Sequence, residues 1–472
     1  MNMQTLEILF RAARVFSADL IVSLGLTPKL KSSLIRTVAG VLLAFAAASP
    51  SIAQKGATSQ ILPAKSLQYM PLRSKHGLEM LSKLATARHT TLQALSSVRI
   101  GTPGVDTVIN WSDRFYAAGY DSNGNPQTVW PYTMVGLPPE LGQTTVINVP
   151  IVPVIVQFLD PKGNVVVTLA PDQNLIEQAL NSPLFQPAAY TSGTGQFNDQ
   201  QFRAQFWDRI AGGQSQGNNW HTLLHPSLKQ ARVIRVPAFR ADGSYAWWQY
   251  QDDNGHLVLA AIDEDTFFNL FFPSTSPVTN ATPVGAAELA GDMTTADITT
   301  FLFGNVALLE NDDPSQCCIL GFHTYDFEPG DARNGNRQRN YMTIFTSWLS
   351  VGAFAPGFTD MLPWSHEMVE TFNDPFATNW TPWWTNSDYY TGLTICQNNL
   401  EGGDVIEVQT TLLTASIALN GMTYHPQNVA LLPFFEFQSP SRAHLGAYSF
   451  PDETALVAVS PGPLLPGCVP AP

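Results

Sequence analysis

The sequence is poor in charged residues. Only 13% of its 472 residues are charged, against about 25% in an ordinary soluble domain. Basic residues are the scarcer kind, because 24 Lys and Arg stand against 38 Asp and Glu, for a net charge of −14. No run rich in Lys or Arg is present. Since a negative chain repels phosphate backbones, nucleic acid is not an expected partner.

The chain also lacks internal repeats of fixed period, which excludes solenoids and propellers. Neither a P-loop nor a Gly-rich dinucleotide fingerprint appears, so the usual sequence signals of a nucleotide site are missing. Hydrophobic residues make up 44% of the chain. That share is enough for a sizeable core, and the length predicts two to three domains or one large domain.

The first 53 residues are predicted to be a secretory signal. A basic leader between Arg11 and Arg36 is followed by the apolar run of residues 38–48, and then by Ser51-Ile-Ala53. This order of basic, apolar and small residues is typical of export signals. The apolar run is shorter than the roughly 20 residues that span a bilayer. We therefore expect a secreted or periplasmic protein without a stable membrane span, with a buried N-terminal helix as the alternative.

Residues 54–135 are predicted to form a basic N-terminal arm. Leucines at helical spacing indicate one amphipathic helix near 77–96. Such an arm on an acidic protein suits a pro-segment or a docking helix, although a solvated lead-in to the first domain explains it as well.

Residues 136–472 are predicted to form one β-rich domain. Long β-branched runs lie at 144–158 and 299–309, and Pro150 and Pro153 are expected to push parts of the first run to an edge or a bulge. We expect an α+β fold with a large mixed β-sheet. Further strands are predicted at 165–168, 232–237, 245–250 and 257–262, and helices at about 173–181, 199–210 and 360–373.

Four cysteines fit an oxidising compartment. A bridge between the neighbours Cys317 and Cys318 would be strained, so we expect one of them to pair with Cys396 and the other with Cys468. No C-x-x-C spacing is present, which disfavours a zinc site made of cysteines.

The sharpest motif is the helical segment Ser365–Pro375. His366 and Glu370 are four residues apart, so on a helix both side chains reach one metal ion from the same face. Glu367 follows the histidine, where a carboxylate can take the proton of a metal-bound water. Zinc accepts a carboxylate in place of the more usual second histidine, and harder ions such as manganese do so as well. The alternative is an ordinary His–Glu pair that stabilises a surface helix.

A metal site needs at least one more ligand, and three residues near the cysteines are candidates. Glu401 is the predicted third ligand, and Asp404 is an alternative ligand or an orienter of the histidine. Upstream, His323 is a candidate ligand or hydrogen-bond donor to an oxyanion. By contrast, the histidine pair His221 and His225 lacks an intervening glutamate and is predicted to be structural. Asp121–Asn125 resembles the start of a calcium loop but is predicted to be a turn.

Three blocks carry a family resemblance: Gly321–Tyr325, Ser365–Pro375 and Glu401–Asp404. Together they resemble the pattern of the exordium (phosphate-induced protein) family, and more closely that of uncharacterised secreted bacterial proteins with the same blocks. The resemblance covers roughly residues 317–451, with Asn373 where the family prefers threonine. It implies a zincin-like metallopeptidase fold around the His-Glu-x-x-Glu helix.

Two functions are therefore expected as alternatives. The first is a secreted metal-dependent hydrolase, most simply a zinc peptidase acting on a peptide or protein substrate. Its ion is held by His366, Glu370 and Glu401, with Glu367 as the general base. The second is a non-catalytic extracellular binding or signalling protein on the same frame. The aromatic stretch Trp380–Tyr390 would then bind a cell-wall or glycan surface by stacking, unless it belongs to the core.

Overall fold

The computed structural model describes residues 61–63, 98–211, 219–274, 278–310, 314, 317–354, 357–387, 394–409, 411–460 and 462–470. The predicted signal of residues 1–53 and the helix predicted near 77–96 lie outside these ranges. Residues Gln60–Pro472 form one unit, and the description below concerns this unit.

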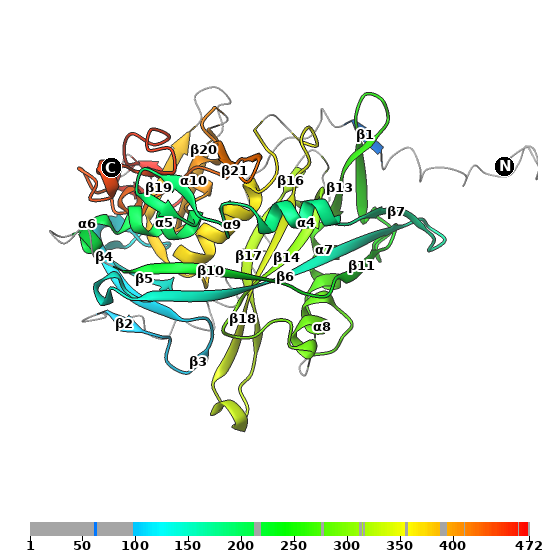
Figure 1. Ribbon diagram of the computed structural model, residues 1–472, viewed down its shortest axis with the longest axis horizontal. Coiled ribbons are helices and arrows are strands. Elements are labelled where there is room, and N and C mark those ends of the chain that lie inside the picture. Colours follow the sequence, from blue (N-terminus) through cyan, green and yellow to red (C-terminus); the bar gives the residue numbers. More distant parts are fainter. Residues whose placement is uncertain are drawn as a thin grey trace, which may run out of the picture. The chain divides into compact units, whose positions relative to one another are not determined.

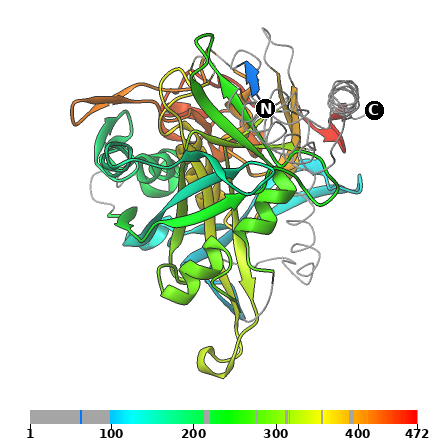
Figure 2. The same ribbon diagram turned by 90° about the vertical axis from the view of Figure 1, so that its right-hand side faces the viewer.

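The largest sheet has eight strands and mixes parallel with antiparallel neighbours (Figure 1). Four parallel strands are followed by one antiparallel strand, which confirms the predicted α+β class with a large mixed sheet. In order they are β10 (His221–Leu228), β6 (Thr144–Leu159), β14 (Ile298–Gly304), β18 (Gln338–Trp348) and β17 (Gly321–Glu328). Three shorter strands join them: β3 (Val105–Asp106), β7 (Val165–Leu169) and β11 (Arg232–Val236). Figures 1 and 2 both show the hairpin of β17 and β18 reaching well beyond its neighbours.

The long strand β6 lies inside this sheet, between β10 and β14, so the edge position expected for parts of it is wrong, and its register with its parallel neighbours shows no bulge at Pro150 or Pro153 either. β6 pairs with β10 up to Ile151 and with β11 from Val154 onward. Pro150 lies just before this change of partner, and Pro153 lies within it. A proline lacks the N–H that a continuous ladder needs, and a change of partner is a place where that loss is tolerated.

A second sheet has five strands, and the predicted run 299–309 turns out to be divided between the two sheets. β14 ends at Gly304, Asn305 adopts a left-handed conformation with φ 53°, and the chain continues as a strand of the second sheet. The order in that sheet is β1 (Ile61–Pro63), β12 (Trp247–Gln251), β13 (Leu257–Asp263), β15 (Val306–Leu309) and β16 (Cys317–Ile319).

Helix α9 (Leu362–Asn373) confirms the helix predicted at 360–373 and is buried on all sides. It contacts β17 and β18 on one side and α5 (Phe197–Gln205) on another. Phe202 of α5 meets Phe372 edge to face, with ring centroids 5.1 Å apart. The helix ends at Asn373, as expected, because Asp374 precedes a proline and leaves the helical conformation.

Residues 98–135, which the sequence analysis assigned to the N-terminal arm, contribute strands to the folded unit. β4 (Asn110–Tyr120) and β5 (Pro126–Val135) form a three-stranded sheet with β2 (Arg99–Ile100). β5 contacts both α9 and β19 (Trp380–Ser387), and β4 contacts β19. β19 belongs to a four-stranded sheet with β20 (Thr394–Asn399), β25 (Leu464–Leu465) and β26 (Val469–Pro470).

The cysteine pairing differs from the expectation. Cys396 pairs with Cys468, and Cys317 pairs with its neighbour Cys318. The predicted cross-pairing fails because Cys396 lies on β20, in a different sheet from β16. Since β19 pairs with both β20 and β25, the C-terminal strands are brought beside Cys396.

The other α-helices and short strands are connected in sequence to the strands described above. They are α4 (Gln173–Leu180), β8 (Ala188–Tyr190), β9 (Gly193–Gly195), α6 (Trp207–Ala211), α7 (Glu264–Phe271), α8 (Pro283–Ala290), α10 (Asp404–Glu407), β21 (Ile417–Leu419), β22 (Met422–Tyr424), β23 (Val429–Ala430), α11 (Leu432–Phe435) and β24 (Ser449–Phe450). Within the described ranges, none of the helices has the length and apolar character required to cross a bilayer.

Candidate metal centre

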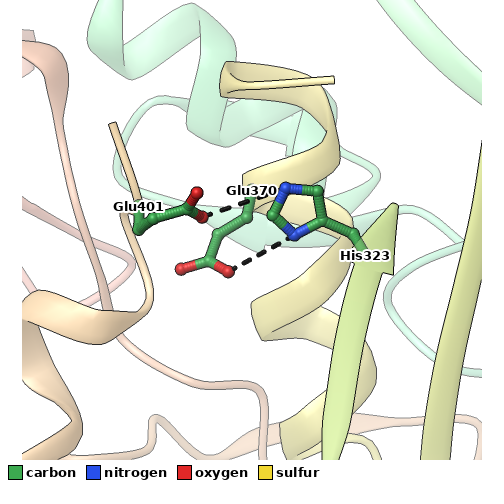
Figure 3. Close-up of side chains that lie close together, drawn as sticks. All are labelled: His323, Glu370 and Glu401. Atoms are coloured by element: carbon green, nitrogen blue, oxygen red, sulfur yellow. Dashed lines mark ion pairs between the residues drawn. The ribbon is translucent and has the colours of Figure 1, made fainter. Parts of the chain in front are cut away.

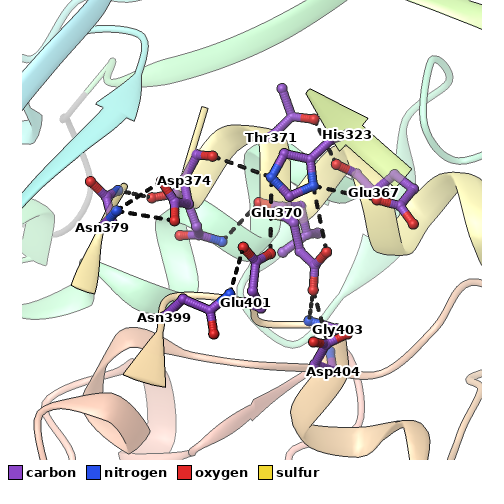
Figure 4. A network of polar contacts seen from close by, with 12 residues as sticks. His323, Glu367, Glu370, Thr371, Asp374, Asn379, Asn399, Glu401, Gly403 and Asp404 are labelled. Carbon is purple, nitrogen blue, oxygen red and sulfur yellow. Dashed lines mark hydrogen bonds and ion pairs between the residues drawn. The ribbon is translucent and has the colours of Figure 1, made fainter. Parts of the chain in front are cut away.

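All six residues predicted for the site lie in one buried cluster, and Figure 4 labels five of them, all but His366. Three come from helix α9, one from strand β17 and two from the segment that follows β20. Each is at most 6% exposed. They are His323, His366, Glu367, Glu370, Glu401 and Asp404.

His366 faces two carboxylates with the same ring nitrogen. Its Nε2 lies 3.0 Å from Oε2 of Glu370 and 3.5 Å from Oδ1 of Asp404. The other oxygen of each carboxylate is held by an amide. The backbone N–H of Gly403 donates to Oε1 of Glu370 over 3.0 Å, and the side-chain amide of Gln397 donates to Oδ2 of Asp404. The oxygens that face the histidine are therefore oriented before any ligand binds.

The tautomer of His366 follows from its contact with Gln427. The Gln427 amide nitrogen donates to the carbonyl of Gly403 over 2.7 Å, so its oxygen must be the atom that lies 3.0 Å from Nδ1 of His366. Nδ1 therefore carries the proton, and Nε2 directs a lone pair at Glu370. Two lone pairs at 3.0 Å repel each other unless a proton or a cation lies between them. This arrangement suits a metal ion bound at Nε2.

His323 forms a second group with Glu370 and Glu401 (Figure 3). Its Nδ1 lies 3.7 Å from Oε2 of Glu370, and its Nε2 lies 3.9 Å from Oε2 of Glu401. The other oxygen of Glu401 accepts a hydrogen bond of 3.0 Å from the Asn399 side chain. Glu401 thus lies against His323, whereas Asp404 lies against His366.

Two glycines let the chain approach the site closely. A Cβ atom on Gly403 would lie 2.4 Å from Nδ1 of His366. A Cβ atom on Gly321 would lie 2.6 Å from Oε1 of Glu367. Real Cβ contacts are never this short, so only glycine fits at either position without a shift.

Burial and mutual repulsion perturb the acids of the cluster. Burial raises the pKa of Glu367 to about 8, and His366 partly opposes that rise. Burial, followed by repulsion from neighbouring carboxylates, holds the pKa values of Glu370 and Glu401 well above their usual range. Groups perturbed in this way gather at functional sites, because catalytic acids and bases need pKa values that differ from the ordinary ones.

No protein-family model, curated protein or solved structure matches the chain. The resemblance to the exordium family therefore stays a prediction. The assignment of function rests on the geometry of the site.

Two residues of the site were missed by the sequence analysis. Gln427 fixes the tautomer of His366, and Glu407 lies 3.3 Å from Nδ1 of the same ring through its Oε1. Glu407 is three residues beyond Asp404, so the acidic spacing of this segment was a usable signal. Gln427 offers no such signal, because it follows Glu370 by 57 positions and reaches the site only through the fold.

The secondary candidates lie outside the cluster. His221, on strand β10, lies with its Nδ1 2.9 Å from Oδ2 of Asp199 on α5, which fits the structural role predicted for this histidine. Asp121 accepts backbone hydrogen bonds from Asn123 and Asn125, and this confirms the predicted turn. In the aromatic stretch Trp384 is fully buried, while residues 388–390 lie outside the described ranges.

Proposed function

We propose that this protein is a metal-dependent hydrolase, most simply a zinc peptidase with α9 as a zincin-like active-site helix. The observation that carries the proposal is the convergence of Glu370 and Asp404 on Nε2 of His366 within 3.5 Å. One imidazole nitrogen and two carboxylate oxygens form a ligand set that zinc accepts, and manganese is the next best fit. The orientation of all three donors by other groups supports the proposal further.

The buried carboxylate of Glu407, behind the His366 ring, also fits a bound ion. Oε2 of Glu407 is buried and accepts no hydrogen bond from the described residues, while Oε1 lies 3.3 Å from Nδ1 of His366. A carboxylate behind a metal-binding imidazole is a common arrangement, because it strengthens the ring as a ligand.

Each nearby side chain has a role in this proposal. A bound divalent ion supplies Lewis-acid chemistry, by polarising a carbonyl and lowering the pKa of water. Glu367 adjoins His366 on the helix, and its carboxylate acts as the general base. His323 lies 3.4 Å from Oε2 of Glu367, where an imidazole N–H can donate to a developing oxyanion.

The substitution Glu367→Gln tests this proposal. It removes the base but leaves His366, Glu370 and Asp404 in place, so we expect the metal content to persist and hydrolysis of a peptide library to be lost. Glu264→Gln is a matched control, because Glu264 is a buried glutamate on α7, away from the site. A folded wild-type protein holding less than about half an equivalent of transition metal would refute the proposal.

A second candidate function is favoured by the burial of the site. The side chains of His366 and Glu370 are 5% and 4% exposed, and closed metal sites are typical of structural ions, whereas catalytic sites keep a position open. In that case the protein is a non-catalytic extracellular binding or signalling protein. Retained metal with no hydrolysis by either the wild type or Glu367→Gln would favour it.

A further inference from the structure

We propose that the site holds two divalent ions, the second bound by His323, Glu370 and Glu401. This inference rests on the proposed function, because it makes Glu370 a ligand shared with the ion at His366. It replaces the oxyanion-donor role of His323 with that of a metal ligand, and it gives a role to Glu401, which a single ion at His366 leaves unused.

The geometry of the His323 group is that of a ligand set. One ligand atom from each of its three members lies within 4.8 Å of the others. They come from a strand, a helix and a loop, so the fold brings together parts of the chain that are far apart in sequence (Figure 3). A second group that shares Glu370 is formed with His366 and Glu367.

Glu370 is placed to bridge the two groups. Its Oε2 lies 3.0 Å from Nε2 of His366 and 3.7 Å from Nδ1 of His323, so one oxygen faces both imidazoles. Its Oε1 is occupied by the backbone N–H groups of Gly403 and Asp404, at 3.0 and 3.3 Å. In two-ion hydrolytic sites the ions lie about 3.5–4 Å apart and share ligands of this kind.

An unsatisfied oxygen points independently to the second ion. Glu401 is 6% exposed, and its Oε2 accepts no hydrogen bond from the described residues although Asn399 holds Oε1. The side chain turns this oxygen toward His323 and Glu370 (Figure 3). A buried carboxylate oxygen without a hydrogen bond is costly, and a cation at this position removes the cost.

The charges of the cluster favour two ions over one. Besides the general base Glu367, three buried carboxylates face the ion positions: Glu370, Glu401 and Asp404. Once the imidazoles act as neutral ligands, one divalent ion leaves one of these three negative charges unbalanced. Two divalent ions balance all three and leave positive charge for Glu367 when it has lost its proton, which lowers the cost of burying these acids.

Metal stoichiometry of the full chain tests the inference. The apo protein is loaded with Mn²⁺, freed of excess ion, and measured by elemental analysis and by electron paramagnetic resonance. We expect two equivalents with a spin-coupled signal in the wild type, and one equivalent with an uncoupled signal in Glu401→Gln. The control Glu264→Gln should match the wild type.

The outcomes separate the two proposals. One equivalent in the wild type that survives Glu401→Gln overturns the second ion and leaves the proposed function standing. One equivalent that Glu401→Gln abolishes overturns the two-ion centre and moves the single ion to His323. No bound metal in a folded wild type overturns both proposals.

If Glu401→Gln does not fold, the variant Asn399→Ala is used in its place. Asn399→Ala keeps the Glu401 carboxylate and removes only the hydrogen bond that its Oε1 accepts. The second equivalent should then bind at least tenfold more weakly, and the first should be unchanged. Equal affinities in Asn399→Ala and the wild type would overturn the inference.

Discussion

Replacing Gln427 with methionine tests whether its side chain sets the tautomer of His366. The change keeps the shape of the side chain but removes the oxygen that accepts from Nδ1 and the nitrogen that donates to Gly403. Among the described residues, Glu407, 3.3 Å from Nδ1, then remains as an acceptor for the Nδ1–H. That contact is longer than the 3.0 Å contact that is lost, so the imidazole takes the other tautomer, with its proton on the nitrogen that should bind metal, more readily.

The expected loss can be estimated from the role of such partners. Removing a group that orients a metal-binding histidine costs roughly 10–100-fold in metal affinity, which is about 1.4–2.8 kcal/mol. The carbonyl of Gly403 also loses its donor, and a buried unpaired group costs about 1–3 kcal/mol of folding stability. The two losses must be measured separately, because only the first is specific to the site.

A chelator competition at fixed pH measures the affinity, and urea unfolding of the apo protein measures the stability. Gln196→Met is the matched control: the amide of Gln196 donates to the carbonyls of Phe185 and Leu224, so it loses similar bonds away from the site. We expect both variants to lose stability and only Gln427→Met to lose metal affinity. Unchanged affinity in Gln427→Met, or an equal decrease in the control, would refute the reasoning.

Three further predictions concern packing, pH and the disulfide. Gly403→Ala places a Cβ 2.4 Å from an imidazole nitrogen and should lower metal content and the midpoint of thermal unfolding, whereas Gly304→Ala, with no contact under 3.4 Å, should keep its metal. Burial raises the pKa of Glu436 from 4.5 to about 7, so the folded state binds the proton more tightly, and its contribution to stability is lost as pH rises from about 4.5 to 7. In urea unfolding across this pH range, the free energy of unfolding should decline less for Glu436→Gln than for the wild type. The same dependence on pH in both proteins would contradict the raised pKa of Glu436. Reduction of Cys396–Cys468, which closes a loop of 72 residues, should cost about 4 kcal/mol and weaken metal binding before circular dichroism detects unfolding.

Local patterns predicted the parts of the site that depend on local structure. His366 and Glu370 are one helical turn apart, so their common face follows from helix geometry once α9 is recognised. The end of that helix also follows from one local feature, the proline after Asp374. The β-branched run that became β6 was recognised for a similar reason, because strand-forming residues need no distant partner to identify them.

Distant contacts explain what was missed. The cysteine pairing depends on which sheets hold Cys317 and Cys396, and no spacing in the chain shows that they lie in different ones. The break between β14 and β15 depends on the left-handed turn at Asn305, a single residue inside an apolar run. Gln427 reaches His366 because its own backbone N–H donates to Ser365 Oγ over 2.9 Å, a contact that only the folded chain creates.

The burial of α9 is itself an argument about function. A helix that stabilises a fold needs one apolar face, and its acids can stay in water. Here His366, Glu367 and Glu370 are turned inward against an acidic segment, although carboxylates buried together repel each other and lose hydration. Apolar residues of similar size would stabilise such a core better than these acids do. The chain thus keeps acidic residues that destabilise its core at the point where three of its segments meet. Residues that are unfavourable for stability are expected where a protein binds a ligand or performs chemistry. Positive charge from outside the chain would make these acidic residues favourable, and the divalent cations that we propose would supply it at the positions that the oriented oxygens face.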